Sequence, residues 1–465
     1  MRELAREPVP DPRAVYDRMR AAHLNAVQGA LEDHLGRLDW SREQIERHRD
    51  QRLRSLLAYA RERSPFHAER LRRFDPASVG VADLASLPAM TKQQAQDAWD
   101  DIVTVPDLDR SGAERILAEQ QWFSYTSHDQ QVFSSGGSSG VRGVYVWDWP
   151  FFITATCLAW RMQARDERRI PSKPPHTRLA VLTAALPPHA STPLFDVPTV
   201  DGMQTVVIEA GAPFDEVLTM VAAAEPTHLV GYATVIGRLA RATSAGELAI
   251  YPSRVSTNSE PLLPEDRDAI RQAWGATVHN LWGSTEIGVQ AVGCGHGDGL
   301  HICEDEVILE RVNADGAPVG PDEPAARTLA TGLANRTFPF IRYDLGAEIT
   351  FLPGQCPCGS AFLRVADVTG RRDDDFDYDS VMVPASAFRH VLGTDPRVTE
   401  YQVIQTATGV DVLVVGDPDV DSLSRAIVSA ARRYGLTQPE VSVRVVARLE
   451  RHRSTGKLKR FVPLG

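Results

Sequence analysis

Residues 205–232 read TVVIEAGAPFDEVLTMVAAAEPTHLVGY, and the alternation inside this segment sets the predicted fold class. Apolar runs at 205–209 and 228–232 have the length of buried strands, and 214–224 between them has helical spacing. A further apolar run, 179–183, precedes them. Strands that alternate with helices form parallel sheets, because the crossover helix returns the chain to the end of the sheet where the previous strand began. We therefore predict an α/β fold with a mixed, partly parallel sheet.

A helical lead-in is predicted over residues 1–100. Ser41 to Gln44 matches a capping box, and the apolar residues after it keep helical spacing until just before Pro65. A more polar helix is predicted over 14–38.

A second, smaller unit is predicted at the other end of the chain. The polar run GRRDDD begins at Gly370 and separates it from the rest. The elements predicted after this run are strands at 402–405, 410–415 and 441–446 and a helix at 422–434. We therefore predict an N-terminal domain over 1–370 and a small α+β domain over 371–465.

Composition excludes several functional classes. The chain has 465 residues, 43% hydrophobic and 24% charged, which fits a folded protein with two or three cores. Its 50 Lys and Arg against 61 Asp and Glu give a net charge of −11 without a basic block, so a nucleic-acid partner is not expected. No apolar run is long enough for a membrane helix and the N-terminus does not look like a signal peptide, so we expect a cytoplasmic protein.

A loop of serine and glycine alone spans residues 134–140, between two apolar runs. Such a loop lets the backbone approach a phosphate closely and offers N–H and O–H donors to it. A flexible linker is the alternative interpretation, and the Gly-Lys-Ser/Thr of a Walker A loop is absent. The predicted phosphate-binding residues are Ser134, Ser135, Gly136, Gly137, Ser138, Ser139 and Gly140.

A second motif, VHNLWGSTE, occupies residues 278–286. Ligands of α/β proteins bind at the carboxyl ends of parallel strands, where Trp282 would stack on a base and Glu286 would hold Mg²⁺. An ordinary strand followed by a helix capped by Thr285 fits equally well. His279, inside the apolar run, is expected to be a core residue.

The third motif is the basic segment 451–460, RHRSTGKLKR. Basic tails are usually solvated. A glycine directly before Lys457 instead suggests a turn that presents one ammonium to an oxyanion.

In their order and spacing these motifs resemble the adenylate-forming superfamily, in its phenylacetate:CoA ligase branch. The resemblance runs from about Ser41 to Arg460. It also rests on Ser64-Pro65-Phe66, Leu87-Pro88 with Thr91-Lys92, Ser259-Glu260-Pro261-Leu262, Asn335 to Pro339 with Ile341-Arg342-Tyr343, Cys356-Pro357-Cys358-Gly359 and Gly370-Arg371.

The resemblance implies a two-step reaction. A carboxylate attacks the α-phosphate of ATP to give an acyl-adenylate and pyrophosphate, and a second nucleophile, usually the CoA thiol, displaces AMP. It assigns Glu286 to Mg²⁺, Thr285 to the α-phosphate and Lys457 to the first half-reaction, with Asp373 as the hinge of a mobile C-terminal domain. The implied nucleotide contacts, besides the Ser/Gly loop, are Ser259, Glu260, Pro261, Trp282, Gly283, Ser284 and Arg371.

The chain departs from the family pattern at two positions. Ala347 stands where the family has the aspartate that binds the ribose. Either Asp344 or Glu348 replaces it, or the ribose contact is weakened. The lysine that often follows the Ser/Gly loop is also absent, and Arg142 offers a charge there.

Four of the five cysteines lie between residues 294 and 358. Cys294, His301, Cys356 and Cys358 are the predicted ligands of a structural Zn²⁺, with His296 and Cys303 in reserve. Some members of the family carry such a site. Free thiols packed as small apolar side chains are the alternative.

The acyl pocket of this fold would come from residues between about 125 and 232, and its aromatic residues favour an aromatic acid. His189 would meet a polar substituent or face solvent. The resemblance leaves the acceptor open: CoA, an amine, as in an amide synthetase, or activated nitrite, as in a diazotase acting on aromatic amines. A non-catalytic nucleotide-binding protein is disfavoured because Glu286 and Lys457 are both present, and a homodimer stays open. The predicted substrate contacts are Tyr125, Phe195, Gly231 and Tyr232, with Phe123 nearby.

Overall fold

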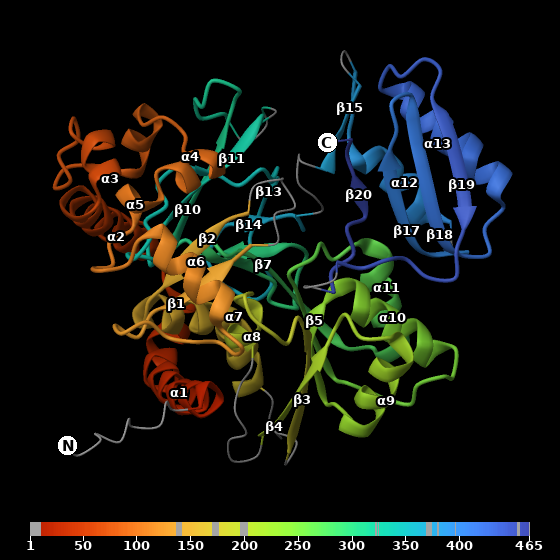
Figure 1. The fold of residues 1–465 in the computed structure, drawn as a ribbon, viewed down its shortest axis with the longest axis horizontal. Helices are drawn as coiled ribbons and strands as arrows, with labels where there is room; N and C mark the ends of the chain where they lie inside the picture. Colours follow the sequence, from red (N-terminus) through yellow and green to blue (C-terminus); the bar gives the residue numbers. More distant parts are fainter. Residues whose placement is uncertain are drawn as a thin grey trace, which may run out of the picture.

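The computed structural model describes residues 11–135, 142–169, 176–195, 203–320, 323, 325–368, 374–378, 381–395, 397–452 and 456–464. The predicted site residues Gly136, Gly137, Ser138, Ser139, Gly140, Arg371 and Asp373 lie outside these ranges. Figure 1 shows a large N-terminal unit and a smaller C-terminal unit, drawn in blue, that stacks on the helices α10 and α11. We call residues 374–464 the C-terminal unit.

A nine-stranded sheet runs through the N-terminal unit in the order β13-β14-β9-β8-β7-β6-β5-β3-β4. Neighbouring strands from β4 to β7 are parallel, and those from β7 to β13 are antiparallel. The predicted strands and the mixed, partly parallel sheet are thus confirmed. The strands are β3 (Thr177–Thr183), β4 (Met203–Glu209), β5 (His228–Tyr232), β6 (Arg254–Asn258), β7 (Thr277–Ser284), β8 (Gly288–Val292), β9 (Leu300–Ile302), β13 (Phe351–Leu352) and β14 (Arg364–Val365).

Helices cover both faces of this sheet because its strands are apolar on both sides. Successive side chains of a strand point to opposite faces, so Leu179 and Val181 join one core cluster and Ala180 and Leu182 join another. The first cluster is completed by α1 (Pro12–Gly36), α7 (Trp149–Arg168) and α8 (Ser191–Phe195), and the second by α9 (Phe214–Ala224), α10 (Ala233–Ser244) and α11 (Pro264–Trp274).

The predicted N-terminal helices are confirmed as α1 and α2 (Arg42–Arg63). Ser41 caps α2: its hydroxyl accepts from the N–H of Gln44 at 3.3 Å, and the Gln44 side chain accepts from the N–H of Ser41 at 2.8 Å. The short helices that follow are η1 (Arg37–Asp39), α3 (Pro65–Arg70), η2 (Val81–Ser86), α4 (Lys92–Asp97), α5 (Trp99–Ile102) and α6 (Arg110–Glu119).

Two smaller sheets complete the N-terminal unit. The strands β1 (Gln131–Ser134) and β2 (Val144–Trp147) form a hairpin, and the Ser/Gly loop lies in the connection between them. The second sheet consists of β10 (Val307–Val312), β11 (Arg327–Gly332) and β12 (Tyr343–Asp344). The hairpin therefore presents the ends of the loop from two buried strands.

The C-terminal unit has its own core, made only of residues between Phe376 and Phe461. Its four-stranded sheet has the order β19-β18-β17-β20, and the predicted strands and helix of this region are present. The elements are β15 (Phe376–Tyr378), β16 (Val381–Val383), α12 (Ala385–Thr394), β17 (Val398–Gln405), β18 (Gly409–Gly416), α13 (Val420–Arg433), β19 (Glu440–Val445) and β20 (Phe461–Val462).

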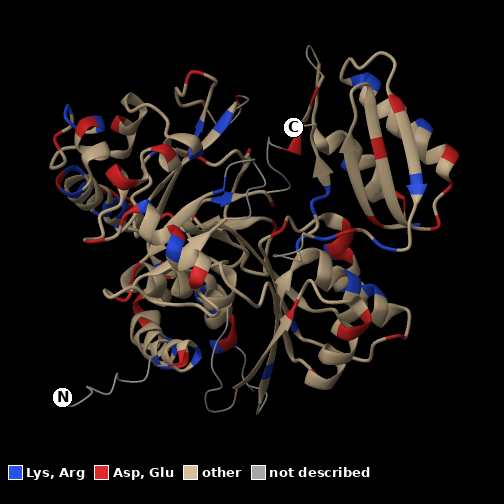
Figure 2. Cartoon of the chain, in the orientation of Figure 1, with Lys and Arg blue, Asp and Glu red and all other residues tan. Residues whose placement is uncertain are grey.

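Charge is spread over the molecule rather than gathered on one side. In the view of Figure 2, Lys and Arg alternate with Asp and Glu along both units. Among the described helices, none combines the length and the apolar character that a membrane crossing requires.

Candidate active site

A cavity of about 400 Å³ lies where the carboxyl ends of β6 and β7 meet the C-terminal unit. This volume is in the range of small-molecule sites in proteins. Both units contribute to its wall, which includes Lys92, Ser135, Trp282, Thr285, Glu286 and Lys457. Residues from every one of the three sequence motifs therefore line one cavity.

Glu286 follows β7 and is held by two tyrosines. The hydroxyls of Tyr145 and Tyr343 donate to its Oε1 at 2.7 and 3.1 Å. Burial, reinforced by the charge of Glu286, raises the pKa of Tyr145 well above its usual value, so this phenol stays a neutral donor. Because both of these bonds end on Oε1, neither tyrosine occupies Oε2.

The end of β7 is positioned by the neighbouring hairpin. The indole N–H of Trp147 on β2 donates to the carbonyl oxygen of Thr285 at 2.9 Å, which fixes the backbone of that residue. Trp282, Gly283 and Ser284 line the cavity beside it. The predicted stacking and phosphate-binding residues of this motif therefore share one wall.

The start of the Ser/Gly loop faces the cavity, with a lysine that sequence reasoning did not assign to it. Ser134 and Ser135 line the cavity, and the ammonium of Lys92 donates to the Ser135 hydroxyl at 3.1 Å. Arg142, expected to supply the charge near this loop, instead pairs with Glu114 at 2.6 Å and is half-exposed. The cation beside the loop thus comes from α4, far upstream in the chain.

Lys457 reaches the cavity from a tight turn. The N–H of Gly456 donates to the carbonyl of His452 at 2.8 Å, and the N–H of His452 donates to the carbonyl of Lys457 at 2.9 Å. Gly456 has φ +66°, and a Cβ there would lie 2.5 Å from the nitrogen of Gly211, so only glycine fits this close contact. This contact explains the glycine before the lysine.

The Lys457 ammonium lies beside two residues of the N-terminal unit. It sits 5.5 Å from the centre of the Tyr232 ring. His189 also lines the cavity. Burial, and next the Lys457 charge, lower the pKa of His189 to about 4, so this imidazole is neutral at pH 7.

Ion pairs and hydrogen bonds dock the C-terminal unit on α10 and α11. Arg460 donates to Asp266 at 3.1 Å, and Arg241 donates to the other oxygen of the same carboxylate at 2.9 Å. Arg451 donates to the Thr234 hydroxyl at 3.0 Å. These contacts hold Lys457 at the cavity.

Glu260 takes part in this docking. Its Oε1 accepts from the N–H of Leu458 at 3.1 Å, and its Oε2 accepts from the hydroxyl and N–H of Thr234 at 2.7 and 3.1 Å. Ser259 and Pro261 line the cavity together with Glu260, as the adenine prediction requires. The Glu260 carboxylate, however, already bonds to the C-terminal unit and to the start of α10.

Neither residue considered for the missing ribose aspartate lines the cavity. Oδ1 of Asp344 accepts from the N–H of Gly346 at 2.9 Å and its Oδ2 lies 3.7 Å from Arg327, because the pairing of β12 with β11 turns this side chain away. Glu348 is exposed outside the cavity, whereas Ala347 lines it. Asp374, at the start of the C-terminal unit, is a carboxylate that does line the cavity.

The four predicted substrate contacts have different positions. Phe195 lines the cavity, and Tyr232 is fully buried under Lys457 with its hydroxyl accepting from the N–H of Ala184 at 3.0 Å. Tyr125 does not line the cavity, because it packs in the core 5.9 Å from the ring of His23. Gly231 does not line it either: its place is structural, since a Cβ there would lie 2.3 Å from the carbonyl oxygen of Leu182.

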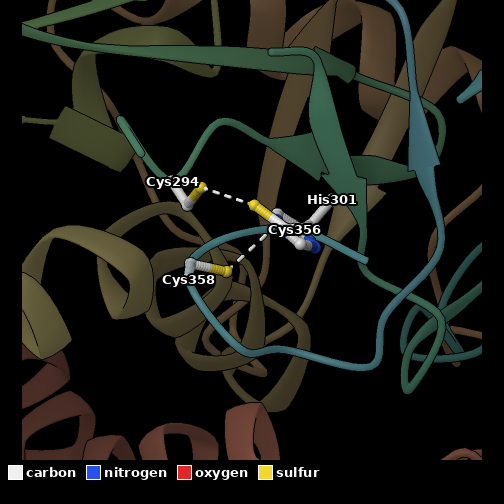
Figure 3. Close-up of side chains that lie close together, drawn as sticks. All are labelled: Cys294, His301, Cys356 and Cys358. Atoms are coloured by element: carbon white, nitrogen blue, oxygen red, sulfur yellow. Dashed lines mark hydrogen bonds between the residues drawn. The ribbon is translucent and has the colours of Figure 1, made fainter. Parts of the chain in front are cut away.

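The predicted metal ligands come together away from this cavity. The ligand atoms of Cys294, His301, Cys356 and Cys358 all lie within 4.8 Å of one another, and all four residues are buried. Figure 3 shows that Cys294 follows β8, His301 lies on β9, and the other two stand on the loop before β14. The bonded pairs are the Cys294 and Cys356 sulfurs at 3.5 Å and the Cys358 sulfur and His301 Nε2 at 3.4 Å.

The chemistry of this cluster fits a zinc ion. The polar neighbours of Cys358, Cys294 first and then His301, hold the pKa of its thiol well below the usual range, so the cluster favours a thiolate. Three cysteines and one histidine are a common donor set for structural Zn²⁺. Cys303 belongs elsewhere, since its thiol is buried beside Arg161 and Asp305, and His296 pairs with Asp166 at 3.0 Å.

Comparison with known proteins places these observations in context. No family model matches the chain. A phenylacetate-coenzyme A ligase of Thermus thermophilus is 25% identical over 394 residues, which cover 79% of this chain and 80% of that ligase.

Among solved structures, a 2-hydroxyisobutyryl-CoA ligase in its postadenylation state, in complex with 2-HIB-AMP, has the same fold. The TM-score is 0.70 at 17% identity, with 91% of this chain and 90% of that chain covered. The same ligase in the thioesterification state, with CoA, gives a TM-score of 0.59 at 16% identity, covering 91% of each chain.

Proposed function

Because the chain belongs to the adenylate-forming superfamily, in its phenylacetate:CoA ligase branch, we propose that it is an AMP-forming ligase. It adenylates a small carboxylic acid with ATP and then transfers the acyl group to CoA. The observation that supports this most strongly is that Thr285, Glu286 and Lys457 line one cavity although they come from two units with different core clusters.

In the first half-reaction the protein stabilises the charge that develops on the α-phosphate. Preorganised cations and hydroxyls are effective here because they need no reorganisation during the reaction. Lys457 supplies a cation at the turn that Gly456 makes, and Thr285 supplies a hydroxyl on the opposite unit. Lys92 would neutralise charge on the departing pyrophosphate, and the hydroxyls of Ser134 and Ser135 would donate hydrogen bonds to it.

Glu286 would hold Mg²⁺ through the oxygen that the two tyrosines leave available. A bound Mg²⁺ neutralises phosphate charge and prefers oxygen ligands. Tyr145 and Tyr343 fix the orientation of the carboxylate, which keeps its second oxygen toward the cavity.

The nucleotide would lie against Trp282, Gly283 and the segment from Ser259 to Pro261, all of which line the cavity. We assign the ribose hydroxyls to Asp374, since Asp344 and Glu348 do not line it. Arg371 and the hinge role of Asp373 stay predictions from the resemblance.

In the second half-reaction the C-terminal unit would swing away so that CoA can enter. This movement must break the bonds of Arg460 to Asp266 and of Leu458 to Glu260. The domain division near residue 370 is part of this proposal.

The cluster of Cys294, His301, Cys356 and Cys358 would bind a structural Zn²⁺ that joins β8, β9 and the loop before β14. Aromatic residues in the cavity wall, Trp147 and Phe195, favour an aromatic acid. A homodimer stays a prediction.

The test is pyrophosphate release, screened over aromatic and aliphatic acids with ATP and Mg²⁺, with and without CoA. Thioester formation that depends on CoA supports the ligase. Turnover with an amine acceptor would indicate an amide synthetase, and turnover with nitrite plus an aromatic amine a diazotase. Absence of pyrophosphate under every condition would indicate a nucleotide-binding protein without turnover.

Lys457→Ala tests the mechanism. Loss of one preorganised charge at the reacting phosphate should lower the rate of pyrophosphate release by roughly 100- to 1,000-fold. ATP binding, measured by calorimetry, should change little. An unaltered rate would remove Lys457 from the mechanism and make Lys459, which also lines the cavity, the next candidate.

A further inference from the structure

Gln290 occupies an irregular position on β8, next to the end of β7. In the pairing of the two strands Val289 lies opposite Gly283 and Ala291 lies opposite Trp282, so Gln290 has no opposite residue. Such an extra residue is a β-bulge, which re-aims a side chain and is frequent beside active sites. The bulge brings the Gln290 side chain to the cavity wall.

The Gln290 side chain is fully buried, and half of its amide is without a partner. Its Nε2 donates to the Ser284 hydroxyl oxygen at 3.0 Å. Its Oε1 accepts no hydrogen bond from any residue that the structure describes. Burial of an unsatisfied carbonyl oxygen is unfavourable, which is why such atoms normally have a partner.

The neighbours of Gln290 in the cavity wall include apolar residues. Leu281 on β7 and Val289 on β8 belong to the two paired strands that form the bulge, and both line the cavity. Ser284, to which Gln290 is bonded, directly precedes Thr285. An acid with its carboxylate beside Thr285 and its body against these apolar side chains would bring its substituents close to the orphaned acceptor.

We propose that Gln290 determines substrate specificity: its Oε1 accepts a hydrogen bond from an O–H or N–H group carried by the acid. The substrate class is then small hydroxy- or amino-substituted carboxylic acids, in preference to their unsubstituted analogues. This inference rests on the proposed ligase function. A site built around a buried acceptor discriminates against an analogue that lacks the donor, because that analogue leaves the acceptor unpaired.

Matched pairs of acids test the inference on the wild-type protein. Pyrophosphate release would be compared for the hydroxybenzoates, aminobenzoates and hydroxyphenylacetates against benzoate and phenylacetate. The best donor-bearing acid should exceed its parent in kcat/KM by roughly 10- to 100-fold, the usual worth of one buried hydrogen bond to substrate. Equal kcat/KM values for all pairs, or a preference for methoxy or nitro substituents, which only accept, would overturn it.

Two variants assign the preference to Gln290. Gln290→Leu should lower kcat/KM for the preferred acid by roughly 10- to 100-fold while that for the parent acid stays within about threefold. Gln290→Glu keeps an acceptor and should retain the order of preference. A preference that survives in Gln290→Leu would contradict the assignment.

Binding separates this inference from the ligase proposal. The rise in melting temperature on adding each acid, with a non-hydrolysable ATP analogue present, is measured for the wild type and for Gln290→Leu. If no acid supports pyrophosphate release, the ligase proposal fails, and the inference is judged by binding alone. A larger shift with the donor-bearing acid, lost in Gln290→Leu, supports it, and equal shifts refute it.

Discussion

Arg460→Met should uncouple the two half-reactions. Arg460 donates to Asp266 at 3.1 Å, and the side chains of the two residues are 11% and 1% exposed. Methionine keeps the apolar stem of the side chain and removes the guanidinium group, with its charge and its hydrogen-bond donors. Asp266 stays paired with Arg241 at 2.9 Å, so the N-terminal unit retains its own ion pair. The perturbation therefore acts on the docking of the C-terminal unit.

The magnitude follows from this geometry. Two unit charges at this distance attract by about 5 kcal/mol at an effective dielectric constant of about 20. Desolvation of both groups offsets part of that attraction, and a hydrogen bond to a charged group contributes about 2–3 kcal/mol net. Since 1.4 kcal/mol is a factor of ten, the equilibrium constant for docking should fall roughly 30- to 150-fold.

The assay measures each half-reaction separately. Pyrophosphate release, which needs Lys457 at the cavity, should fall with the docked population, by that factor at most. Thioester formation from a synthetic acyl-adenylate and CoA should stay near wild type, because the docking bond is already broken in that step. Arg397→Met is the matched control, since Arg397 is half-exposed and pairs with Asp395 inside the C-terminal unit at 2.9 Å. Equal losses in both half-reactions, or no loss in the first, would refute the reasoning.

Three further predictions concern the loop, the cluster and a buried histidine. Lys92→Ala should weaken inhibition by pyrophosphate by roughly tenfold, because one charged contact is lost. Arg142→Ala is the control and should not weaken it, since Arg142 pairs with Glu114. Similar inhibition constants in both variants would exclude Lys92. Metal analysis should find one zinc per chain, and a strong chelator or Cys356→Ser should lower the melting temperature; zinc-free protein of unchanged stability would remove the site. Burial lowers the pKa of His67 to about 3, while its Nε2 bonds to the carbonyl of Pro339 at 2.9 Å. In the unfolded chain this histidine has a pKa near 6.5, so as the pH falls it is protonated before the folded protein is. The free energy of unfolding therefore falls below about pH 6.5, by about 1.4 kcal/mol per pH unit. In urea titrations at pH 7 and 5, His67→Gln should lose less of this free energy than the wild type.

The elements of the fold were predictable where their signals are local. The capping box at Ser41 and the strand–helix–strand spacing of 179–232 depend on residues only a few positions apart. The same holds for the turn at Gly456, whose glycine the structure explains by its contact with Gly211. The Cys and His residues from 294 to 358 could be selected because thiolate and imidazole are the donors that zinc prefers.

Long-range placement decided the rest of the candidate site. Lys92 reaches Ser135 only because α4 packs beside the β1–β2 hairpin, and Asp344 is turned away by the pairing of β12 with β11. Glu260 bonds to the C-terminal unit, which no feature of its own segment indicates. The bulge that aims Gln290 exists only in the pairing of two strands.

The amino-acid sequence by itself thus determined the layered α/β architecture, the candidate residues proposed for phosphate, Mg²⁺ and zinc, and the turn that carries Lys457, since these follow from chemistry and spacing along the chain. Tertiary structure alone decided which cation serves the Ser/Gly loop, which carboxylates line the cavity and which buried acceptor lacks a partner. The physical reason is that a hydrogen bond or an ion pair depends on distances between segments, and those distances arise only when the separate cores pack together.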